Sequence, residues 1–407
     1  MAIPPLIRAD FPSLGRIYQG QPLVYFDGPA GTQVPLQVID AIAAYYRTHN
    51  ANTHGQFVTS LESDPVLAET RVAVAAFLGT ANSSTVSFGA NMTSLAFALS
   101  RTFARAFKNG DEVVITQLDH EANRGPWLTL QEKGVLVREV RLRSDGTLDE
   151  SDMRRQISAR TRLVCLGLAS NALGTVNNVA LARELSARVG AWMLLDGVHY
   201  APHFPIDVVA LQTDFLLCSA YKFYGPHVGI LYCRDGLLDG LEPDRLLTQD
   251  QRSPHRIETG TQNHAALAGV MAAVNYIAAL GEGPDLRRRI VTAMKRIGLH
   301  EREVAIDLYD RLRRIPGLTI YGPEFGGDLR APTISFTIGG LTAEAVCRRL
   351  GAEGICTWDG HFYAIRAIET LGLLGRGGVT RVGISMYNTH EEARRVAKVV
   401  EQIAKHR

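Results

Sequence analysis

The sequence predicts an α/β protein with a largely parallel central sheet, because short apolar runs alternate with helical patterns over residues 65–235. The runs with the length of a buried strand are Glu112–Thr116, 163–167, Trp192–Asp196 and Phe215–Ser219. A helical pattern over residues 181–189 lies between two of them. This alternation is typical of crossover connections, so we expect helices on both faces of the sheet.

A smaller α+β domain is expected after this region, since 407 residues exceed what one compact core holds. A helical stretch over residues 264–280 is broken by Gly-Glu-Gly-Pro at 281–284. A second long helix is predicted over residues 286–314, followed by short strands that include Thr333–Ile338. The expected division is a large domain of residues 22–280 and a small domain of residues 1–21 plus 281–407.

The bulk composition excludes several classes of protein. There are 43 basic and 41 acidic residues, a net charge of +2, so nucleic acid and anionic membranes are not expected partners. We see no transmembrane run of about 18 apolar residues and no signal peptide after Met1. The cysteines form no CxxC pair, which argues against a disulfide framework or a zinc site and favours the cytoplasm. They are Cys165, Cys218, Cys233, Cys347 and Cys356.

The strongest chemical signal is the segment Ser-Ala-Tyr-Lys-Phe-Tyr-Gly-Pro at 219–226, where Lys222 directly follows a predicted strand. A partly desolvated amine has a lowered pKa and suits Schiff-base chemistry, although Lys222 alone is more readily explained as a surface lysine near a turn. Asp196 ends another strand 26 residues earlier. A carboxylate there could cap a helix, or it could keep a pyridine nitrogen protonated. Both residues lie at carboxyl strand ends, where such sheets bind ligands, and together they favour a pyridoxal phosphate site.

Three weaker features fit the same cofactor. Residues 87–94, Ser-Phe-Gly-Ala-Asn-Met-Thr-Ser, precede a predicted helix over 95–103, and form either a phosphate cup or a plain helix cap. His120 follows a strand and is either a ring that stacks on the cofactor or a structural histidine. Asn171 follows another strand and is either an amide that binds a phenolic oxygen or a turn former.

These features together resemble the fold-type I pyridoxal phosphate enzymes, and among them the class V aminotransferase/cysteine desulfurase family. The likeness spans nearly the whole chain and rests on an ordered set of motifs. They are Tyr25-Phe-Asp-Gly-Pro-Ala-Gly-Thr-Gln-Val-Pro35, Asn171-Ala-Leu-Gly-Thr175, Asp196-Gly-Val-His199, the Lys222 segment, Gly260-Thr-Gln-Asn263 and Arg381-Val-Gly-Ile-Ser-Met-Tyr-Asn-Thr389.

The resemblance implies a role for each matching residue. Lys222 would carry the cofactor and move protons, Asp196 would pair with the pyridine nitrogen, and His120 would stack on the ring. Asn171 and His199 would contact the 3-oxygen, with His199 standing where desulfurases usually have glutamine. The phosphate would be held by Ala90, Asn91, Ser219 and Tyr221. A partner subunit would add Thr261, Asn263 and His264, which implies a homodimer. Arg381 would bind the substrate carboxylate, a task that suits a guanidinium fork.

One departure from the family pattern concerns the fate of sulfur. Group II cysteine desulfurases carry an Arg-x-Gly-His-His-Cys-Ala loop whose cysteine accepts sulfur as a persulfide. The chain reads Trp358-Asp-Gly-His-Phe-Tyr-Ala364, so Tyr363 replaces the cysteine and Trp358 the arginine, while His361 is kept. Cys356 lies nearby and is interpreted as a buried structural thiol in a strand over 354–357. Trp358, His361, Tyr363 and residues 50–60 are expected to shape the substrate pocket.

The sequence therefore predicts a pyridoxal phosphate enzyme that acts on an L-amino acid. The preferred hypothesis is a desulfurase-like lyase acting on a sulfur- or selenium-containing amino acid without a loop persulfide. A class V aminotransferase or epimerase is the alternative enzyme, and a non-catalytic cofactor-binding protein is the alternative from another class.

Overall fold

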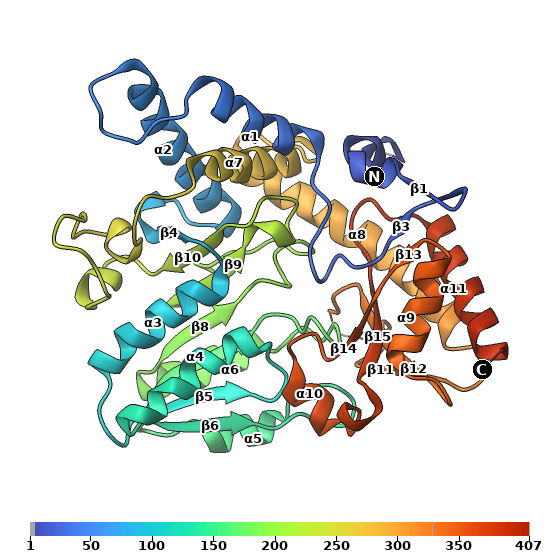
Figure 1. The fold of residues 1–407 in the computed structure, drawn as a ribbon. Coiled ribbons are helices and arrows are strands. Elements are labelled where there is room, and N and C mark those ends of the chain that lie inside the picture. Colours follow the sequence, from blue (N-terminus) through green and yellow to red (C-terminus); the bar gives the residue numbers. More distant parts are fainter. Residues whose placement is uncertain (1–4, 328, 407) are drawn as a thin grey trace.

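The computed structural model describes residues 5–327 and 329–406. Its central element is a seven-stranded sheet in the order β4-β10-β9-β8-β7-β5-β6 (Figure 1). Strands β9, β8, β7, β5 and β6 pair in parallel, whereas β10 is antiparallel to both β9 and β4. The predicted α/β class with a mostly parallel sheet is confirmed. The strands are β4 Val86–Gly89, β5 Glu112–Thr116, β6 Leu136–Val140, β7 Thr161–Gly167, β8 Trp192–Asp196, β9 Phe215–Ser219 and β10 Gly229–Cys233.

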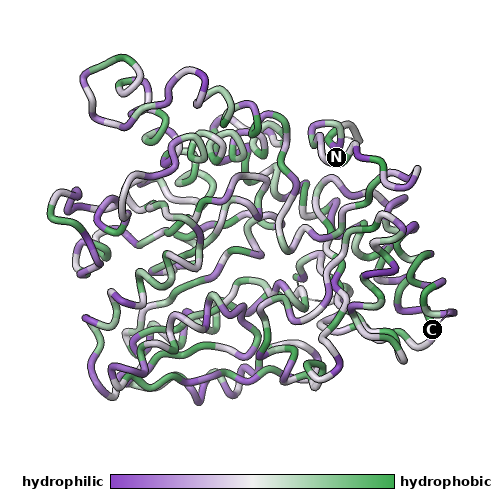
Figure 2. The backbone as a smooth tube through the Cα atoms, viewed as in Figure 1, coloured by the Kyte–Doolittle hydropathy of each residue, from purple (hydrophilic) through white to green (hydrophobic). Residues whose placement is uncertain are grey.

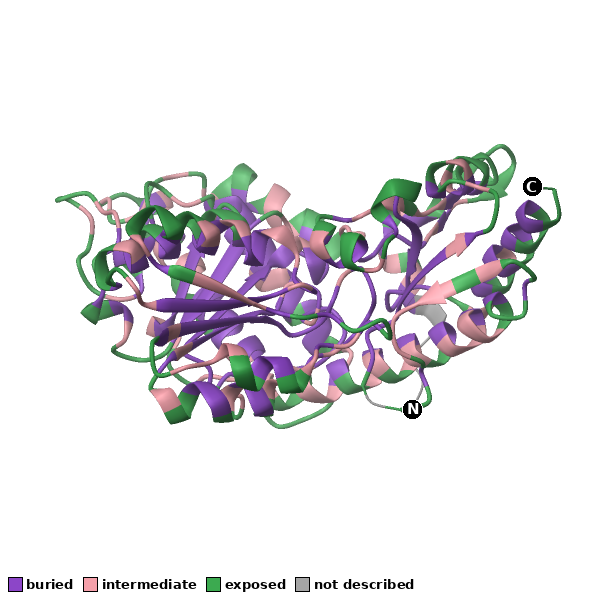
Figure 3. Cartoon of the chain, turned by 90° about the horizontal axis from the view of Figure 1, so that it is seen from below, coloured by how far each residue is buried: buried purple, intermediate pink, exposed green. Residues whose placement is uncertain are grey.

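Helices cover both faces of this sheet because its strands present apolar side chains alternately to each side. On β5, Val114 packs into the core shared with α2, α6, α7 and the start of α8, while Val113 and Ile115 pack against α3 and α4. Figures 2 and 3 show the result, apolar and buried strands between helices whose outer faces are exposed. The helices are α1 Leu36–Thr48, α2 Val58–Leu78, α3 Met92–Ala106, α4 Gly125–Leu128, α5 Glu150–Gln156, α6 Val179–Val189 and α7 His264–Ala279.

A second core lies in the C-terminal part of the chain, around the four-stranded antiparallel sheet β11-β12-β15-β14. Its strands are β11 Leu318–Tyr321, β12 Thr333–Ile338, β14 Trp358–Gly360 and β15 Val379–Gly383. Its helices are α9 Ala343–Ala352, α10 Ile365–Thr370 and α11 His390–Lys405. Near the N-terminus lie β1 Ile17–Tyr18, β2 Gln21–Pro22 and β3 Val24–Tyr25, and β3 pairs in parallel with β13 Ile355–Cys356.

Helix α8, Leu286–Leu312, joins the two cores. Ile290 and Ile297 pack in the large core, and Val304 and Leu308 pack in the small one. The helix ends at Leu312, two residues before the predicted end, because the chain turns before Pro316-Gly317. The division at residue 280 stays a prediction, and residues 1–4 of the expected small domain lie outside the described residues.

Two details near the predicted pocket loop differ from expectation. Trp358–Gly360 forms strand β14, paired with β15, rather than the start of a loop, because the backbone groups of this segment complete the edge of the small sheet. Cys356 is half-buried rather than buried, since β13 pairs only with the short strand β3 at the surface of the small core.

Candidate active site

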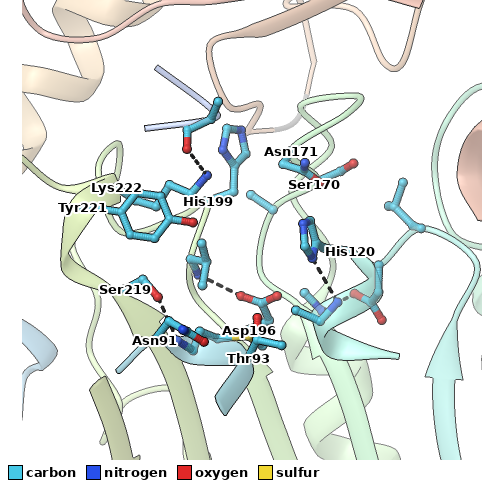
Figure 4. Close-up of a pocket in the computed structure, with 18 of the residues that line it drawn as sticks. Asn91, Thr93, His120, Ser170, Asn171, Asp196, His199, Ser219, Tyr221 and Lys222 are labelled. Atoms are coloured by element: carbon cyan, nitrogen blue, oxygen red, sulfur yellow. Dashed lines mark hydrogen bonds between the residues drawn. The ribbon is translucent and has the colours of Figure 1, made fainter. Parts of the chain in front are cut away.

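Polar residues from four parallel strands meet at one edge of the large sheet, where the strands end. His120, Asn171 and Lys222 follow β5, β7 and β9, respectively, and Asp196 is the last residue of β8. All four line one cavity of about 540 Å³, into which their side chains converge in Figure 4. His199, Asn91, Ser219 and Tyr221 line the same cavity. The structure thus brings together eight residues that the sequence predicted for the cofactor.

Lys222 is buried at the end of a short 3₁₀ turn that follows β9. Its Nζ donates to the carbonyl oxygens of Pro29 and, at 2.9 Å, Ala30. Burial, aided by the positive charge of Arg381, lowers the pKa of Lys222 to about 7, against the opposing influence of Asp27 and Asp196. A large fraction of this amine is therefore unprotonated at neutral pH, which is the form that attacks an aldehyde.

Asp196 ends β8, and its Oδ1 accepts a hydrogen bond of 2.9 Å from the backbone N–H of Val198. Burial raises the pKa of Asp196 to about 6. Because the carboxyl is still ionised at neutral pH but poorly solvated, a cationic N–H partner in the cavity would be bound strongly.

His120 is held as a neutral ring. Its Nδ1 accepts the backbone N–H of Ala122 at 3.0 Å, which leaves Nε2 to carry the proton. Burial, aided by the charge of Lys222, lowers the pKa of His120 to about 4. An uncharged imidazole of fixed orientation is suited to stacking on an aromatic ligand.

His199, which follows β8 just after Asp196, and Asn171, which follows β7, also face the cavity. His199 Nε2 lies 3.0 Å from Thr333 Oγ1, while its Nδ1 is buried without a hydrogen-bond partner among the described residues. Burial lowers the pKa of His199, so the ring is neutral. Asn171 Nδ2 donates to the Phe362 carbonyl oxygen at 2.9 Å. The Nδ1 of His199 is thus a buried polar atom to which a ligand could hydrogen-bond.

The N-terminus of α3 borders the cavity, which Asn91, Met92 and Thr93 line. Asn91 caps the helix, with its Oδ1 accepting the Ser94 N–H at 2.8 Å, and Ser219 Oγ accepts the Met92 N–H at 3.0 Å. Gly229 on β10 permits this arrangement, because a Cβ there would lie 2.3 Å from the backbone carbon of Asn91. A helix start of this kind binds anions such as phosphate.

Four predicted phosphate residues lie elsewhere in the single chain. Ala90, Thr261 and Asn263 line a neighbouring cavity of about 390 Å³. The His264 ring contacts the Tyr45 hydroxyl and the Ala51 carbonyl, both at 3.2 Å, and lines neither this cavity nor the Lys222 cavity as far as the described residues show. Their predicted role in a partner subunit's site stays a prediction.

Arg381 lies in a second cavity of about 650 Å³, to which Trp358, His361 and Tyr363 also contribute. Lys222, His120 and Asn171 line both cavities, so the two are continuous. We call this second cavity the outer cavity. It contains every residue that the sequence predicted for substrate binding, apart from residues 50–60.

The Arg381 guanidinium is already paired within the chain. Its Nη2 lies 2.9 Å from Asp27 Oδ1, its Nη1 donates to the Asn171 carbonyl at 3.2 Å, and its plane lies 4.1 Å from the Phe362 ring centre. Burial raises the pKa of Asp27, an effect that the charge of Arg381 opposes. A substrate carboxylate would share Arg381 with Asp27.

The sequence missed several residues at this site. Asp119 is buried with Oδ1 accepting the Gly167 N–H at 2.7 Å, and burial raises its pKa to about 7. The His227 ring stacks on Tyr221 with 4.6 Å between centroids and 9° between planes. Thr93 follows the α3 cap and lines both cavities. The sequence did offer a signal for each, since Asp119 precedes His120, His227 follows the Lys222 segment and Thr93 lies two residues after Asn91.

None of the five cysteines, all within the described residues, lines either cavity. Burial raises the pKa of the Cys356 thiol, with a further contribution from Asp27. Over residues 5–327 and 329–406 there is also no cluster of three or more acidic, histidine or cysteine side chains suited to a metal ion. No helix in the same ranges is long and apolar enough to cross a membrane.

Comparison with known proteins identifies the family. The family model for aminotransferase class-V matches residues 24–396. A cysteine desulfurase of Enterobacter sp. (strain 638) is 34% identical over 98% of the chain and 97% of its own length. The apo structure of a cysteine desulfurase from Thermococcus onnurineus NA1 superposes with a TM-score of 0.89 at 27% identity, covering 100% of the chain and 99% of its own. A cysteine desulfurase from Escherichia coli, with an S-sulfonic acid, gives a TM-score of 0.86 at 25% identity over 100% and 99%. The family predicted from the motifs is thus confirmed, and the chain belongs to the aminotransferase class-V family.

Proposed function

We propose that the chain is a pyridoxal phosphate enzyme in which Lys222 carries the cofactor. The observation that supports this most is a buried lysine with a pKa of about 7, which shares one strand-end cavity with the buried carboxyl of Asp196. Bound pyridoxal phosphate supplies an electron sink that makes the Cα–H bond of an amino acid acidic.

The residues of the cavity fit each part of this cofactor. Asp196 would hold the ring nitrogen in its protonated form, and the neutral His120 ring would stack on the pyridine. The unsatisfied Nδ1 of His199 offers a contact for the phenolic oxygen. The α3 N-terminus with Ser219 would hold the phosphate. When substrate displaces the lysine, the free amine of Lys222 would take up the Cα proton.

The proposed substrate is an L-amino acid with sulfur or selenium at Cβ. Its carboxylate would bind Arg381 at the junction of the two cavities. The relatives are named cysteine desulfurases, which supports sulfur chemistry. Since no cysteine lines either cavity, we infer that sulfur leaves by elimination and is not transferred to a loop thiol. Homodimers in the cytoplasm are also proposed, on the family resemblance.

The experiment begins with the visible absorbance band that pyridoxal phosphate gains when bound to a lysine. Purified protein should show this band, and Lys222→Ala should abolish it. Incubation with L-cysteine, L-selenocysteine and S-substituted cysteines should then release pyruvate and ammonium together with sulfide, selenide or the free thiol, respectively. A wild-type protein without the band would refute the cofactor assignment. Pyridoxamine phosphate accumulation, or racemised substrate, would replace the lyase by an aminotransferase or an epimerase, and no change with any amino acid would leave a binding protein.

A further inference from the structure

We propose that the outer cavity binds an apolar, preferably aromatic, substituent on the substrate sulfur, so that the protein is a carbon–sulfur lyase for S-substituted L-cysteines. This inference rests on the proposed function. It assigns the substrate class through the cavity that contains Trp358 and Tyr363.

The continuity of the two cavities places the substituent. Lys222, His120 and Asn171 line both spaces, and Arg381 lines the outer one. A substrate whose Cα lies beside Lys222 and whose carboxylate lies at Arg381 would direct Cβ and its sulfur toward the outer cavity. Free cysteine carries a single heavy atom beyond Cβ and would leave most of those 650 Å³ unfilled. A larger substituent on sulfur would use that space.

The walls of the outer cavity are rich in aromatic surface. Phe97 of α3, Trp358 of β14 and Tyr363 are 38%, 51% and 66% exposed, and Pro126 and Phe362 complete the wall. Large aromatic side chains that stay exposed around one opening mark a ligand site, since a soluble protein otherwise covers such surface. Their flat faces suit an aromatic ring better than a polar chain.

The loop that carries Tyr363 is held in place before any ligand arrives. Phe362 and Tyr363 both adopt left-handed backbone conformations, with φ of 52° and 57°. Such strain persists only where the surroundings impose it. Asn171 Nδ2 donates to the Phe362 carbonyl at 2.9 Å, and the Glu121 N–H donates to the Tyr363 carbonyl at 2.7 Å. The aromatic wall is therefore preorganised, which reduces the entropy cost of binding.

The charges around the outer cavity favour an uncharged substituent. Asp359 lines it without an ion-pair partner among the described residues, and Glu121 lines it with Oε2 3.6 Å from Arg124 Nε. The positive charge of Arg381 is matched by Asp27 at 2.9 Å. A sulfonate or carboxylate on the sulfur would meet this acidic rim and be repelled. A phenyl or benzyl group would pay no such penalty.

The proposed reaction needs no acceptor thiol. Lys222 removes the Cα proton, the Cβ–S bond breaks with its electron pair leaving on sulfur, and the sulfur gains a proton to give a free thiol. The three-carbon fragment then takes up one water and yields pyruvate and ammonium. One S-substituted cysteine plus one water thus gives one thiol, one pyruvate and one ammonium ion, with no oxidant or reductant.

The test compares S-phenyl-L-cysteine, L-cysteine and S-sulfo-L-cysteine as substrates of the holoenzyme, with pyruvate and thiol both quantified. We expect kcat/KM for the phenyl compound to exceed that for cysteine by roughly tenfold or more, from burial of one phenyl ring. Trp358→Ala and Tyr363→Ala should each lower this ratio by roughly tenfold through KM. Tyr18→Ala should leave the ratio unchanged, because Tyr18 is an exposed tyrosine on β1 that lines neither cavity.

A binding measurement separates recognition from turnover. L-Homophenylalanine has the shape of S-phenyl-L-cysteine without a leaving group, and calorimetry should show it binding the holoenzyme at least tenfold more tightly than L-2-aminobutyrate. Equal affinity of the two, or a kcat/KM for cysteine or the sulfonate as high as for the phenyl compound, would overturn the substrate class alone. Absence of any elimination product from every substrate, despite the lysine-bound absorbance band, would overturn the proposed lyase function with it.

Discussion

Gly229→Ala tests whether the start of α3 is the phosphate cradle. Gly229 lies in β10, and an added Cβ would stand 2.3 Å from the carbonyl carbon, 2.5 Å from the oxygen and 2.7 Å from the Cα of Asn91. These are backbone atoms, so the side chains cannot relieve the contact. Reaching an ordinary van der Waals distance requires the two segments to separate by about 1 Å. The backbone angles of Gly229 suit alanine, since its φ lies outside the left-handed region.

The displacement has two expected consequences. Overpacking of this kind costs about 1–3 kcal/mol of folding stability. It also moves the N–H groups of residues 92 and 93 relative to Ser219. Loss of one charge-assisted hydrogen bond to phosphate, about 1.5–3 kcal/mol, would weaken cofactor binding about 10- to 150-fold.

The assay is titration of apo-protein with pyridoxal phosphate, in which the absorbance of the lysine-bound form measures binding. Circular dichroism establishes that the variant is folded. Gly240→Ala is the matched control, because no described atom lies within 4 Å of a Cβ added there. Its affinity should equal that of the parent. If folded Gly229→Ala bound the cofactor within threefold of the parent, the phosphate would not sit at the start of α3.

Three further predictions concern an arginine, a buried ion pair and a cysteine. Arg381→Met removes the positive charge that is, next to burial, the main cause of the lowered pKa of Lys222. The pH midpoint for pyridoxal phosphate uptake, expected near 7 in the parent, should therefore move upward. An unchanged midpoint would contradict the coupling between Arg381 and Lys222. Glu301→Gln breaks a fully buried pair between Glu301 and His203 Nδ1, which lie 2.8 Å apart. Denaturant titration should show a loss of about 3 kcal/mol in the free energy of unfolding. A loss below about 1 kcal/mol would argue against an ionic pair. Cys356→Ser should leave thiol and pyruvate release within twofold, because the thiol lines neither cavity; abolished release would restore a role for it.

The sheet-edge half of the site was predictable from the sequence for a physical reason. Parallel strands present their carboxyl ends at one edge, so residues that directly follow predicted strands must lie near one another. Asp196 ends a strand, His120, Asn171 and Lys222 each follow one within a few residues, and the strand pattern was strong. The order of the strands was not needed to expect that these side chains share one cavity.

Contacts between distant segments could not be predicted in the same way. Asp27 and Arg381 are 354 residues apart and meet only because β15 runs beside the segment after β3. His227 stacks on Tyr221 through a turn whose geometry no propensity specifies. The half-buried state of Cys356 depends on how little covers the two-residue strand β13. Each of these depends on tertiary packing, which local sequence patterns do not encode.

The replacement of a cysteine by Tyr363 acquires its meaning from such distant contacts. The loop is tied to β7 through Asn171 and to the segment after β5 through Glu121, so its backbone position is fixed by the large domain's strand ends. The centres of the Tyr363 and His120 rings lie 5.5 Å apart. A thiol at this position would face the substrate sulfur and could accept it, whereas the phenol offers a flat apolar face and no nucleophilic sulfur. In the proposed reaction, the same scaffold would favour release of sulfur with its substituent attached, and a larger substituent would gain more from the wall that Tyr363 forms with Trp358.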